Sequence, residues 1–321
     1  MVEVGVALWS MQRTHAAPSP GWPQLYHDLQ TDARLAESLG YDSLWVAEHR
    51  FWYDGWCPQP LVAAASALSA TSRLVVGTAM HLLPQHDPDR SSQTFDSLRT
   101  LFSDRFQLGV SLGYRDEEYD GVGLLRSQRG RLMDAALDRL ADQGRLAQEL
   151  PTIWVGGMAP AAIRRAARRG LSLLLPPTLS ADDIRRIAAQ AREISAQAGV
   201  PPGRIGMVKD IWVTDGSAQE RDAHVTRLDV HYREYAGAWW MLKGRPGFSQ
   251  PDLLDKQMRR TAQTAIIGPI DQVISELTEL TGAGVDMLAL SISSDVTRDL
   301  YHDHMALIAD RVLPDIVGVP S

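Results

Sequence analysis

The sequence predicts a (β/α)8 TIM barrel, a closed ring of parallel strands with a helix after each strand. Two observations predict this fold. Short apolar runs alternate with amphipathic helical segments eight times along the 321 residues, and most of these runs are continuous, as in strands buried on both faces. Eight strand-then-helix units favour closure over the competing doubly wound open sheet. We expect residues 1–321 to form one domain.

The elements follow from these patterns in chain order. The apolar runs predict strands over Val2–Trp9, Ser43–Ala47, Leu74–Met80, Phe106–Gly113, Thr152–Gly156, Leu171–Leu175, Ile205–Val213 and Val285–Ile292. Amphipathic periodicity predicts helices over Trp22–Leu39, Gln59–Ala70, Asp89–Phe102, Leu125–Glu149, Pro160–Arg169, Ser180–Gln197, Ser217–Trp240, Ile270–Thr281 and Arg298–Leu313. Ser180 and Asp215–Ser217 are typical helix starts, and glycines stand where helices should end, at Gly40, Gly170, Gly199 and Gly284.

Composition narrows the class of partner. The net charge is -7, and no dense block of basic residues stands on a predicted surface, which argues against nucleic acid or an anionic membrane as the main partner. A small-molecule substrate fits better. The single cysteine, Cys57, cannot form an intramolecular disulfide, and no signal-peptide pattern or long apolar run is evident. We therefore expect a protein of the reducing cytoplasm.

A titratable pair, Glu48 and His49, follows the second predicted strand directly. Active sites of TIM barrels lie at the carboxyl ends of the strands, so this pair is a candidate for proton-transfer chemistry. The alternative is a helix cap or a solvent-facing pair. Gly156 and Gly157, after the fifth strand, could present backbone N–H groups to a phosphate at the start of the next helix, or could form a simple tight turn.

A set of residues in order along the chain resembles the bacterial luciferase-like flavin monooxygenases. The resemblance covers most of the chain, from Trp9 to about Leu290. The residues are specific for the family only when taken together, and no single motif among them would be sufficient. The residues that carry the resemblance are Ala47-Glu48-His49, Pro60–Ala65, Thr71, Gly77-Thr78-Ala79, Leu83-Pro84, Pro88, Arg105–Gly109, Gly113, Glu118, Gly123, Arg129, Ile153–Gly157, Ala166-Ala167 and Ile267-Gly268.

The resemblance implies a barrel that binds reduced FMN, or in a related branch a reduced deazaflavin coenzyme, at its C-terminal face. In the FMN branch, dioxygen reacts at the reduced flavin and the substrate is oxygenated. By position, His49 matches the catalytic histidine of the family, and Glu48 would orient or tune it, although adjacent residues on a strand point to opposite faces. The resemblance also implies a homodimer.

The resemblance further implies a set of cofactor-binding residues. The Ala79–Met80 bond matches a position that often carries a non-prolyl cis peptide beneath the flavin, and Ser111 matches the residue beside the flavin on the fourth strand. The remaining candidates are Gly113, Arg115, Gly156, Gly157 and Met158.

The chain departs from the family at the phosphate site. Luciferase-type members place an arginine against the FMN phosphate one residue after the position of Ser111, where this chain has Leu112. Phosphate binding would then rest on the Gly157 and Met158 amides, a helix N-terminus and Arg115, although Arg115 could equally be a solvated loop residue. This departure leaves open weak FMN binding, the deazaflavin alternative, or loss of the flavin.

The variable loops are candidates for substrate recognition. Aromatic residues near the barrel mouth could form an apolar wall for the substrate, or could pack under a long loop: Trp9, Trp52, Tyr53 and Trp56. His81 is expected to be structural or substrate-facing, and no His, Asp or Glu set has convincing metal spacing, so we expect no metal. The segment Met241–Thr264 resembles the mobile active-site segment of the family and could be a lid, or an ordinary surface insertion.

These features lead to three hypotheses for the function. The first is a monooxygenase that uses reduced FMN and dioxygen on an organic small molecule, such as one in natural-product biosynthesis. It implies a separate flavin reductase, because no Gly-x-Gly-x-x-Gly fingerprint follows a predicted strand. The second is a deazaflavin-dependent hydride-transfer oxidoreductase. The third is a catalytically silent flavin- or ligand-binding protein.

Overall fold

A computed structural model of the protein describes residues 1–7, 21–50, 57–142, 153–241, 259–260, 263–292 and 296–317. The predicted aromatic wall at Trp9, Trp52, Tyr53 and Trp56 lies outside the described residues, and so does most of the predicted lid.

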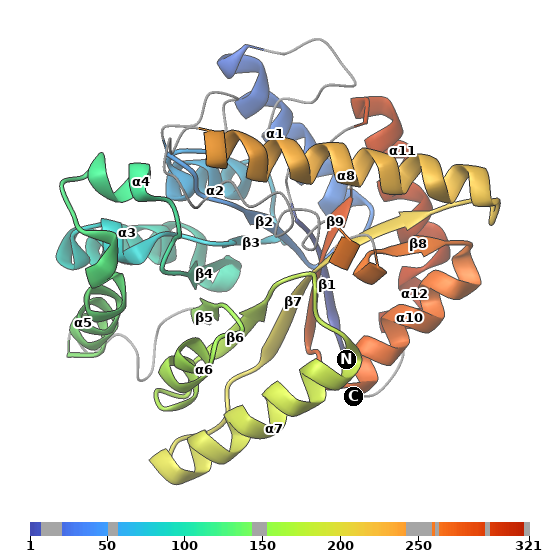
Figure 1. Ribbon diagram of the computed structural model, residues 1–321. Helices are drawn as coiled ribbons and strands as arrows, with labels where there is room; N and C mark the ends of the chain where they lie inside the picture. The colour runs from blue at the N-terminus through green and yellow to red at the C-terminus, as the bar shows by residue number, and fades with distance from the viewer. Residues whose placement is uncertain are drawn as a thin grey trace.

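The strands form a closed, parallel, eight-stranded barrel with the helices around its outside (Figure 1). The ring runs through β1 to β7 and returns through β9 to β1, closed by the pairing of β6 with β7. Its strands are β1 Glu3–Ala7, β2 Ser43–Val46, β3 Val75–Thr78, β4 Phe106–Val110, β5 Ile153–Gly156, β6 Ser172–Leu175, β7 Ile205–Val213 and β9 Met287–Ile292. The prediction of a (β/α)8 barrel is confirmed, and each ring strand lies within a predicted range.

One strand was not predicted. Residues Ile266–Gly268 form β8, which pairs only with the last residues of β7, from Ile211 to Val213. The first part of β7, from Gly206 to Ile211, pairs with β9. Because β7 is nine residues long, it extends past the ring and leaves an edge for one more short strand. Three apolar residues are too short a run to distinguish from a helix or a loop by periodicity.

Most helices lie at nearly the predicted positions, whereas the short helices at Asp116–Asp120 and Leu313–Val317 were not predicted. The helices are α1 Trp22–Ser38, α2 Pro60–Ser69, α3 Pro88–Phe102, α4 Asp116–Asp120, α5 Arg129–Asp142, α6 Pro160–Ala167, α7 Ala181–Ala198, α8 Ala218–Met241, α10 Ile270–Gly282, α11 Arg298–Arg311 and α12 Leu313–Val317, with short 3-10 turns at Leu83–Gln85, Ser103–Arg105 and Arg126–Gln128. Ser180 starts α7 with a capping box that it shares with Asp183, and Gly199 ends this helix at φ 71°.

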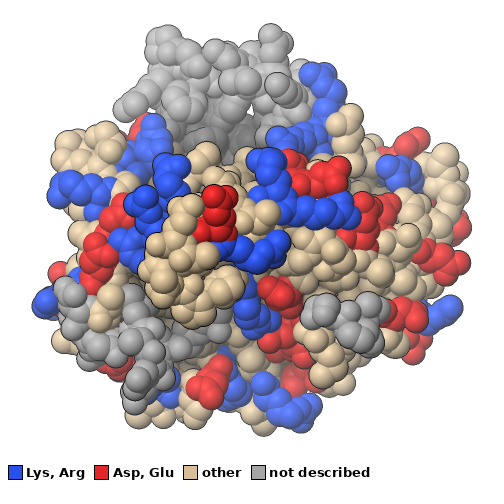
Figure 2. Space-filling model, turned by 90° about the horizontal axis from the view of Figure 1, so that it is seen from below, with Lys and Arg blue, Asp and Glu red and all other residues tan. Residues whose placement is uncertain are grey.

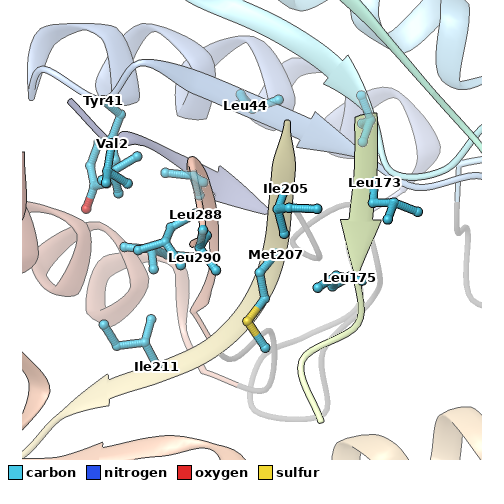
Figure 3. Packing of buried hydrophobic residues seen from close by; sticks show 14 of the residues in the cluster. Val2, Tyr41, Leu44, Leu173, Leu175, Ile205, Met207, Ile211, Leu288 and Leu290 are labelled. Carbon is cyan, nitrogen blue, oxygen red and sulfur yellow. The ribbon is translucent and has the colours of Figure 1, made fainter. Parts of the chain in front are cut away.

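Apolar side chains pack on both sides of the strands. Outward-facing residues such as Leu44, Ile205 and Leu288 form the layer between the strands and the helices (Figure 3). Inside the barrel, the Trp45 and Trp154 rings meet edge to face with centroids 5.8 Å apart. A Cβ on Gly77 would approach the Trp45 ring to 2.4 Å, so this glycine makes room for the indole. The two tryptophans therefore fill the barrel interior with packed side chains, as in a core rather than a pore.

Among the described helices, none has the length and apolar composition that crossing a membrane requires.

Candidate active site

A cavity of about 450 Å³ opens at the carboxyl ends of the strands. Seven of the eight predicted cofactor-binding residues line it. The lining is mainly apolar and consists of Ala79, Met80, Ser111, Leu112, Gly113, Tyr114, Gly156, Gly157, Met158, Ala159, Ala162, Leu174, Leu175, Pro176 and Val208. These residues come from β3 to β7 and the segments that follow them, so the site depends on closure of the ring.

Met80 lies in a space left by glycines of the neighbouring strands. The peptide bond between Ala79 and Met80 is cis, and the Ala79 N–H donates to the Val46 carbonyl at 2.6 Å. A Cβ on Gly156 would come within 2.9 Å of the Met80 side chain, and a Cβ on Gly109 would come within 3.0 Å. The missing side chains therefore allow Met80 to lie against β4 and β5.

The start of α6 lies at one end of the cavity. The Gly157 N–H donates to the Leu174 carbonyl at 3.2 Å and is therefore part of the sheet. The expectation that this amide binds a phosphate is wrong. In the described part of the chain, the amides of Met158, Ala159 and Ala161 have no backbone acceptor. These three N–H groups, at a helix N-terminus beside the cavity, are the ones that could bind an anion.

His49 connects a buried carboxylate to the cavity wall. Its Nδ1 lies 3.1 Å from Glu118 Oε1, and its Nε2 lies 3.5 Å from the hydroxyl of Tyr114, which lines the cavity. With Glu118 as acceptor, Nδ1 carries a proton and Nε2 is left to accept one; this assigns the tautomer from the hydrogen-bond network. The His49 ring is itself buried, so Tyr114 stands between it and the cavity.

Glu48 belongs to a different cluster. Its Oε2 accepts the Leu82 N–H and lies 2.8 Å from His81 Nδ1, and its Oε1 lies 2.9 Å from His86 Nε2 and 3.0 Å from Arg50 Nε. Burial alone would raise the pKa of Glu48, but His81 and His86 hold it well below its usual value, so the carboxylate stays charged. The expectation that Glu48 orients His49 is wrong, because the two side chains leave the chain on opposite sides.

The Glu48 cluster also has the composition of a metal site. Glu48, His81 and His86 each offer a ligand atom, and these atoms lie within 4.8 Å of one another. No local pattern in the sequence predicts that these three side chains form a cluster. The guanidinium of Arg50 lies among these ligands, with Nη2 2.6 Å from His86 Nε2. A cation is therefore already present beside the carboxylate, which disfavours a divalent ion there.

A profile of the luciferase-like monooxygenases matches residues 3–287, which is most of the chain. The chain belongs to the luciferase-like monooxygenase family.

Relatives within this luciferase-like family include oxygenases. The chain is 25% identical over 330 residues to the 4-hydroxyprotoasukamycin monooxygenase of Streptomyces nodosus subsp. asukaensis, covering 92% of this chain and 87% of that protein. Among solved structures, the oxygenating constituent of the 3,6-diketocamphane monooxygenase of Pseudomonas putida, in complex with FMN, superposes with a TM-score of 0.77 at 17% identity. That match covers 98% of this chain and 99% of the other.

A structure with a different cofactor is similar as well. An F420-dependent secondary alcohol dehydrogenase, in complex with an F420-acetone adduct, superposes with a TM-score of 0.75 at 17% identity and covers 98% of this chain and 99% of the other. At these identities the likeness establishes the shared fold. The luciferase-like fold therefore includes FMN and deazaflavin enzymes among its members.

Two further predicted residues of this luciferase-like chain do not reach the cavity. Arg115 is fully buried, and its Nη1 donates to the Arg50 carbonyl at 2.8 Å and lies 3.4 Å from Glu118 Oε1. Burial contradicts both alternatives for Arg115, a phosphate contact and a solvated loop residue. His81 is also fully buried, which contradicts the substrate-facing alternative and agrees with the structural one. Both side chains hold the loops beneath the site in place.

The contacts of Glu118 and Tyr114 with His49 were not predicted from the sequence. Glu118 was noted only as part of the family pattern, and Tyr114 had no role in the sequence analysis. Glu118 stands 69 residues after His49, and no local pattern connects them. Its place in the family pattern is a signal for Glu118, whereas an acidic residue within the short α4 is a weaker one, because a solvated helix face would give the same signal.

Proposed function

We propose that this luciferase-like protein is a flavin-dependent monooxygenase that uses reduced FMN and dioxygen to oxygenate an organic small molecule. The observation that carries the proposal is the Glu118–His49–Tyr114 chain, which ends at the wall of an apolar cavity in the barrel mouth. Such a cavity with a few polar groups at defined positions is typical of a cofactor site. Natural-product biosynthesis is one setting for such an activity.

The residues of the cavity fit a flavin. Ala79, Met80 and Val208 offer apolar surface to a flat ring, and Ser111 offers a hydroxyl at its edge. The Met158 and Ala159 amides could hold the phosphate. When bound, reduced FMN supplies the electrons that activate dioxygen.

The protein's own side chains handle the protons. His49 Nε2 accepts a proton from the Tyr114 hydroxyl or returns one to it, and Glu118 stabilises the imidazolium that forms. The apolar lining at Leu112 and Leu174 excludes water from the reacting groups. Of Glu118, His49 and Tyr114, Tyr114 is the residue that lines the cavity, so proton transfer from His49 to the bound reactants goes through the Tyr114 hydroxyl.

The proposal also specifies partners. A separate reductase supplies the reduced FMN, because the predicted strands lack a following nicotinamide fingerprint. We also propose a homodimer and a single domain, supported by the resemblance to the family, and a cytoplasmic location, supported by the single cysteine. The segment 241–264 is proposed as a lid.

Hydride transfer from a reduced deazaflavin coenzyme is the second candidate. Leu112 favours it, because it stands at the cavity where luciferase-type members place an arginine against the FMN phosphate. The superposition on an F420-dependent dehydrogenase supports the same candidate.

Anaerobic titration separates the candidates. The pure protein is titrated with reduced FMN and, separately, with reduced deazaflavin, and then mixed with aerated buffer or with candidate carbonyl substrates. Oxygen-dependent oxidation of bound FMN with oxygen transfer to a test substrate supports the monooxygenase. Oxidation of deazaflavin by a carbonyl substrate without dioxygen supports hydride transfer. Binding with neither reaction points to a catalytically silent protein.

A further inference from the structure

A second hollow, lined by arginines, lies beside the first turn of α6. It encloses about 500 Å³ between α5 and α6, and its lining residues are Asp134, Ala161, Arg164, Arg165, Arg168 and Arg169. Figure 2 shows the face of the molecule that carries α6 and α7, where blue basic side chains gather. The protein has a net charge of -7, whereas the side chains that line this hollow, four arginines and one aspartate, carry a net positive charge.

Two of the arginines are neutralised by carboxylates. Arg165 binds Asp134 through two hydrogen bonds, of 2.8 and 3.0 Å, and Arg169 binds Asp138 at 2.6 Å. The hydrogen bond from Arg165 lowers the pKa of Asp134, which therefore stays ionised. These pairs build the wall of the hollow and hold its shape.

The other two arginines are available to a ligand. Arg164, on α6, and Arg168, the residue that follows the end of α6, are both exposed and stand four residues apart. Within the described ranges, neither guanidinium has an acidic side chain within 4.0 Å. Like charges at this spacing repel each other, and an anion between them would relieve that repulsion.

The hollow adjoins the cofactor cavity. Ala161 lines the hollow, whereas Ala159 and Ala162, in the same helical turn, line the cavity. Of the three residues with free amides at the start of α6, Met158 and Ala159 line the cavity and Ala161 lines the hollow. Arg164 follows Ala161 by three residues and lines the same hollow. This arrangement offers a positive charge that Leu112 does not supply inside the cavity.

We propose that the arginine hollow is an anion subsite that binds the acidic end of the cofactor through Arg164 and Arg168. The inference rests on the proposed function, because it takes the ligand of the adjoining cavity to be a flavin or deazaflavin. Two sources share this chemistry. One is the phosphate of FMN, and the other is the row of acidic groups on the side chain of a deazaflavin coenzyme. Both are anions that arginine binds with charge-assisted hydrogen bonds.

Binding measurements on a double variant test the subsite. The variant is Arg164→Gln with Arg168→Gln, and the matched control is Arg185→Gln with Arg186→Gln, which removes the same charge from α7. Dissociation constants for FMN, riboflavin, the deazaflavin coenzyme and its form without acidic groups are measured by fluorescence at two salt concentrations. Inorganic pyrophosphate, followed by calorimetry, probes the hollow without a flavin.

We expect the Arg164/Arg168 variant to lose about tenfold or more in affinity for the acidic cofactor and to show a weaker salt dependence. Riboflavin and the deazaflavin without acidic groups should bind as before. A loss confined to FMN assigns the phosphate, and a loss confined to the deazaflavin coenzyme assigns its side-chain acids. An equal loss in the α7 control, or no loss for either acidic cofactor, overturns the subsite.

The pyrophosphate arm separates this inference from the proposed function. If the unmodified protein binds no flavin of either kind, the proposed function fails. The anion subsite then stands if pyrophosphate binds the unmodified protein and binds the Arg164/Arg168 variant more weakly. It falls if pyrophosphate binds both proteins equally or neither.

Discussion

His49 Nδ1 lies 3.1 Å from Glu118 Oε1, although the acidic neighbour of His49 in the sequence is Glu48. The carboxylate that orients the imidazole comes from α4, in the loop region after the fourth strand, and fixes which ring nitrogen faces Tyr114. Glu48 instead holds His81, His86 and Arg50. Glu118 and Glu48 therefore have separate partners: Glu118 contacts His49, and Glu48 contacts the loop residues Arg50, His81 and His86.

We predict that Glu118→Gln lowers turnover about 10²-fold or more while flavin affinity changes little, because an amide cannot stabilise the imidazolium of His49. The pH profile of kcat should shift as well. Glu117→Gln is the matched control, since Glu117 is the neighbouring acid and has a partly exposed side chain. Steady-state kinetics with a flavin titration check this, and equal losses in both variants would contradict the pairing.

Replacement of His49 by alanine should slow oxygenation far more than it weakens flavin binding, because the ring is buried behind Tyr114 and does not line the cavity. Tyr114→Phe should show a smaller loss of the same kind, since it removes one hydroxyl and keeps the ring. Single-turnover mixing of reduced flavin complexes with dioxygen measures both. Unchanged single-turnover rates in His49→Ala would remove this residue from the mechanism.

Loss of the Glu48 carboxylate should destabilise the fold. Glu48→Gln leaves Arg50, His81 and His86 without their buried counter-charge, and breaking a buried ion pair costs about 3–5 kcal/mol in the free energy of unfolding. Asp89→Asn is the control, because the Asp89–Arg139 pair is half exposed and should contribute less than about 1 kcal/mol. Denaturant unfolding of both variants gives the comparison, and similar losses would contradict the role of burial.

Stability should fall as the pH drops below about 6.5. Trp212 is stacked between the rings of His224 and His304, with centroids 4.3 and 3.5 Å away. Burial lowers the pKa of His224 to about 3 and that of His304 to about 4, from an ordinary value of 6.5. Between pH 6.5 and about 4 the unfolded chain binds protons that the folded protein does not, so acid favours unfolding.

The variant His224→Phe checks the pH prediction. It keeps an aromatic ring against Trp212 and removes one titrating group, so the loss of stability between pH 6.5 and 4 should become smaller. His302→Gln serves as the control, because His302 is partly exposed and lies outside the stack. Thermal unfolding at a series of pH values measures the slope. A slope that His224→Phe leaves unchanged would assign the acid sensitivity elsewhere.

The sequence by itself determined the barrel and the strand end that carries His49. Continuous apolar runs and helical periodicity are local signals, so eight strand-and-helix units could be read without knowing any contact. The positions along the cavity, from Ala79 to Met158, followed from the family resemblance together with the rule that barrel sites lie at the carboxyl ends of the strands. The short strand β8 was not predicted, because a run of three residues is too short to show a periodicity.

Only the tertiary structure decided which charges meet. Glu118 reaches His49 across 69 residues, and Glu48 meets His86 across 38, through loops whose paths no local pattern specifies. From the sequence Arg115 was either a phosphate ligand or a solvated loop residue, yet folding buries it beneath the site. No local pattern places Arg164 and Arg168 at a hollow, and they became a candidate anion subsite because closure of the barrel sets α6 beside the cavity.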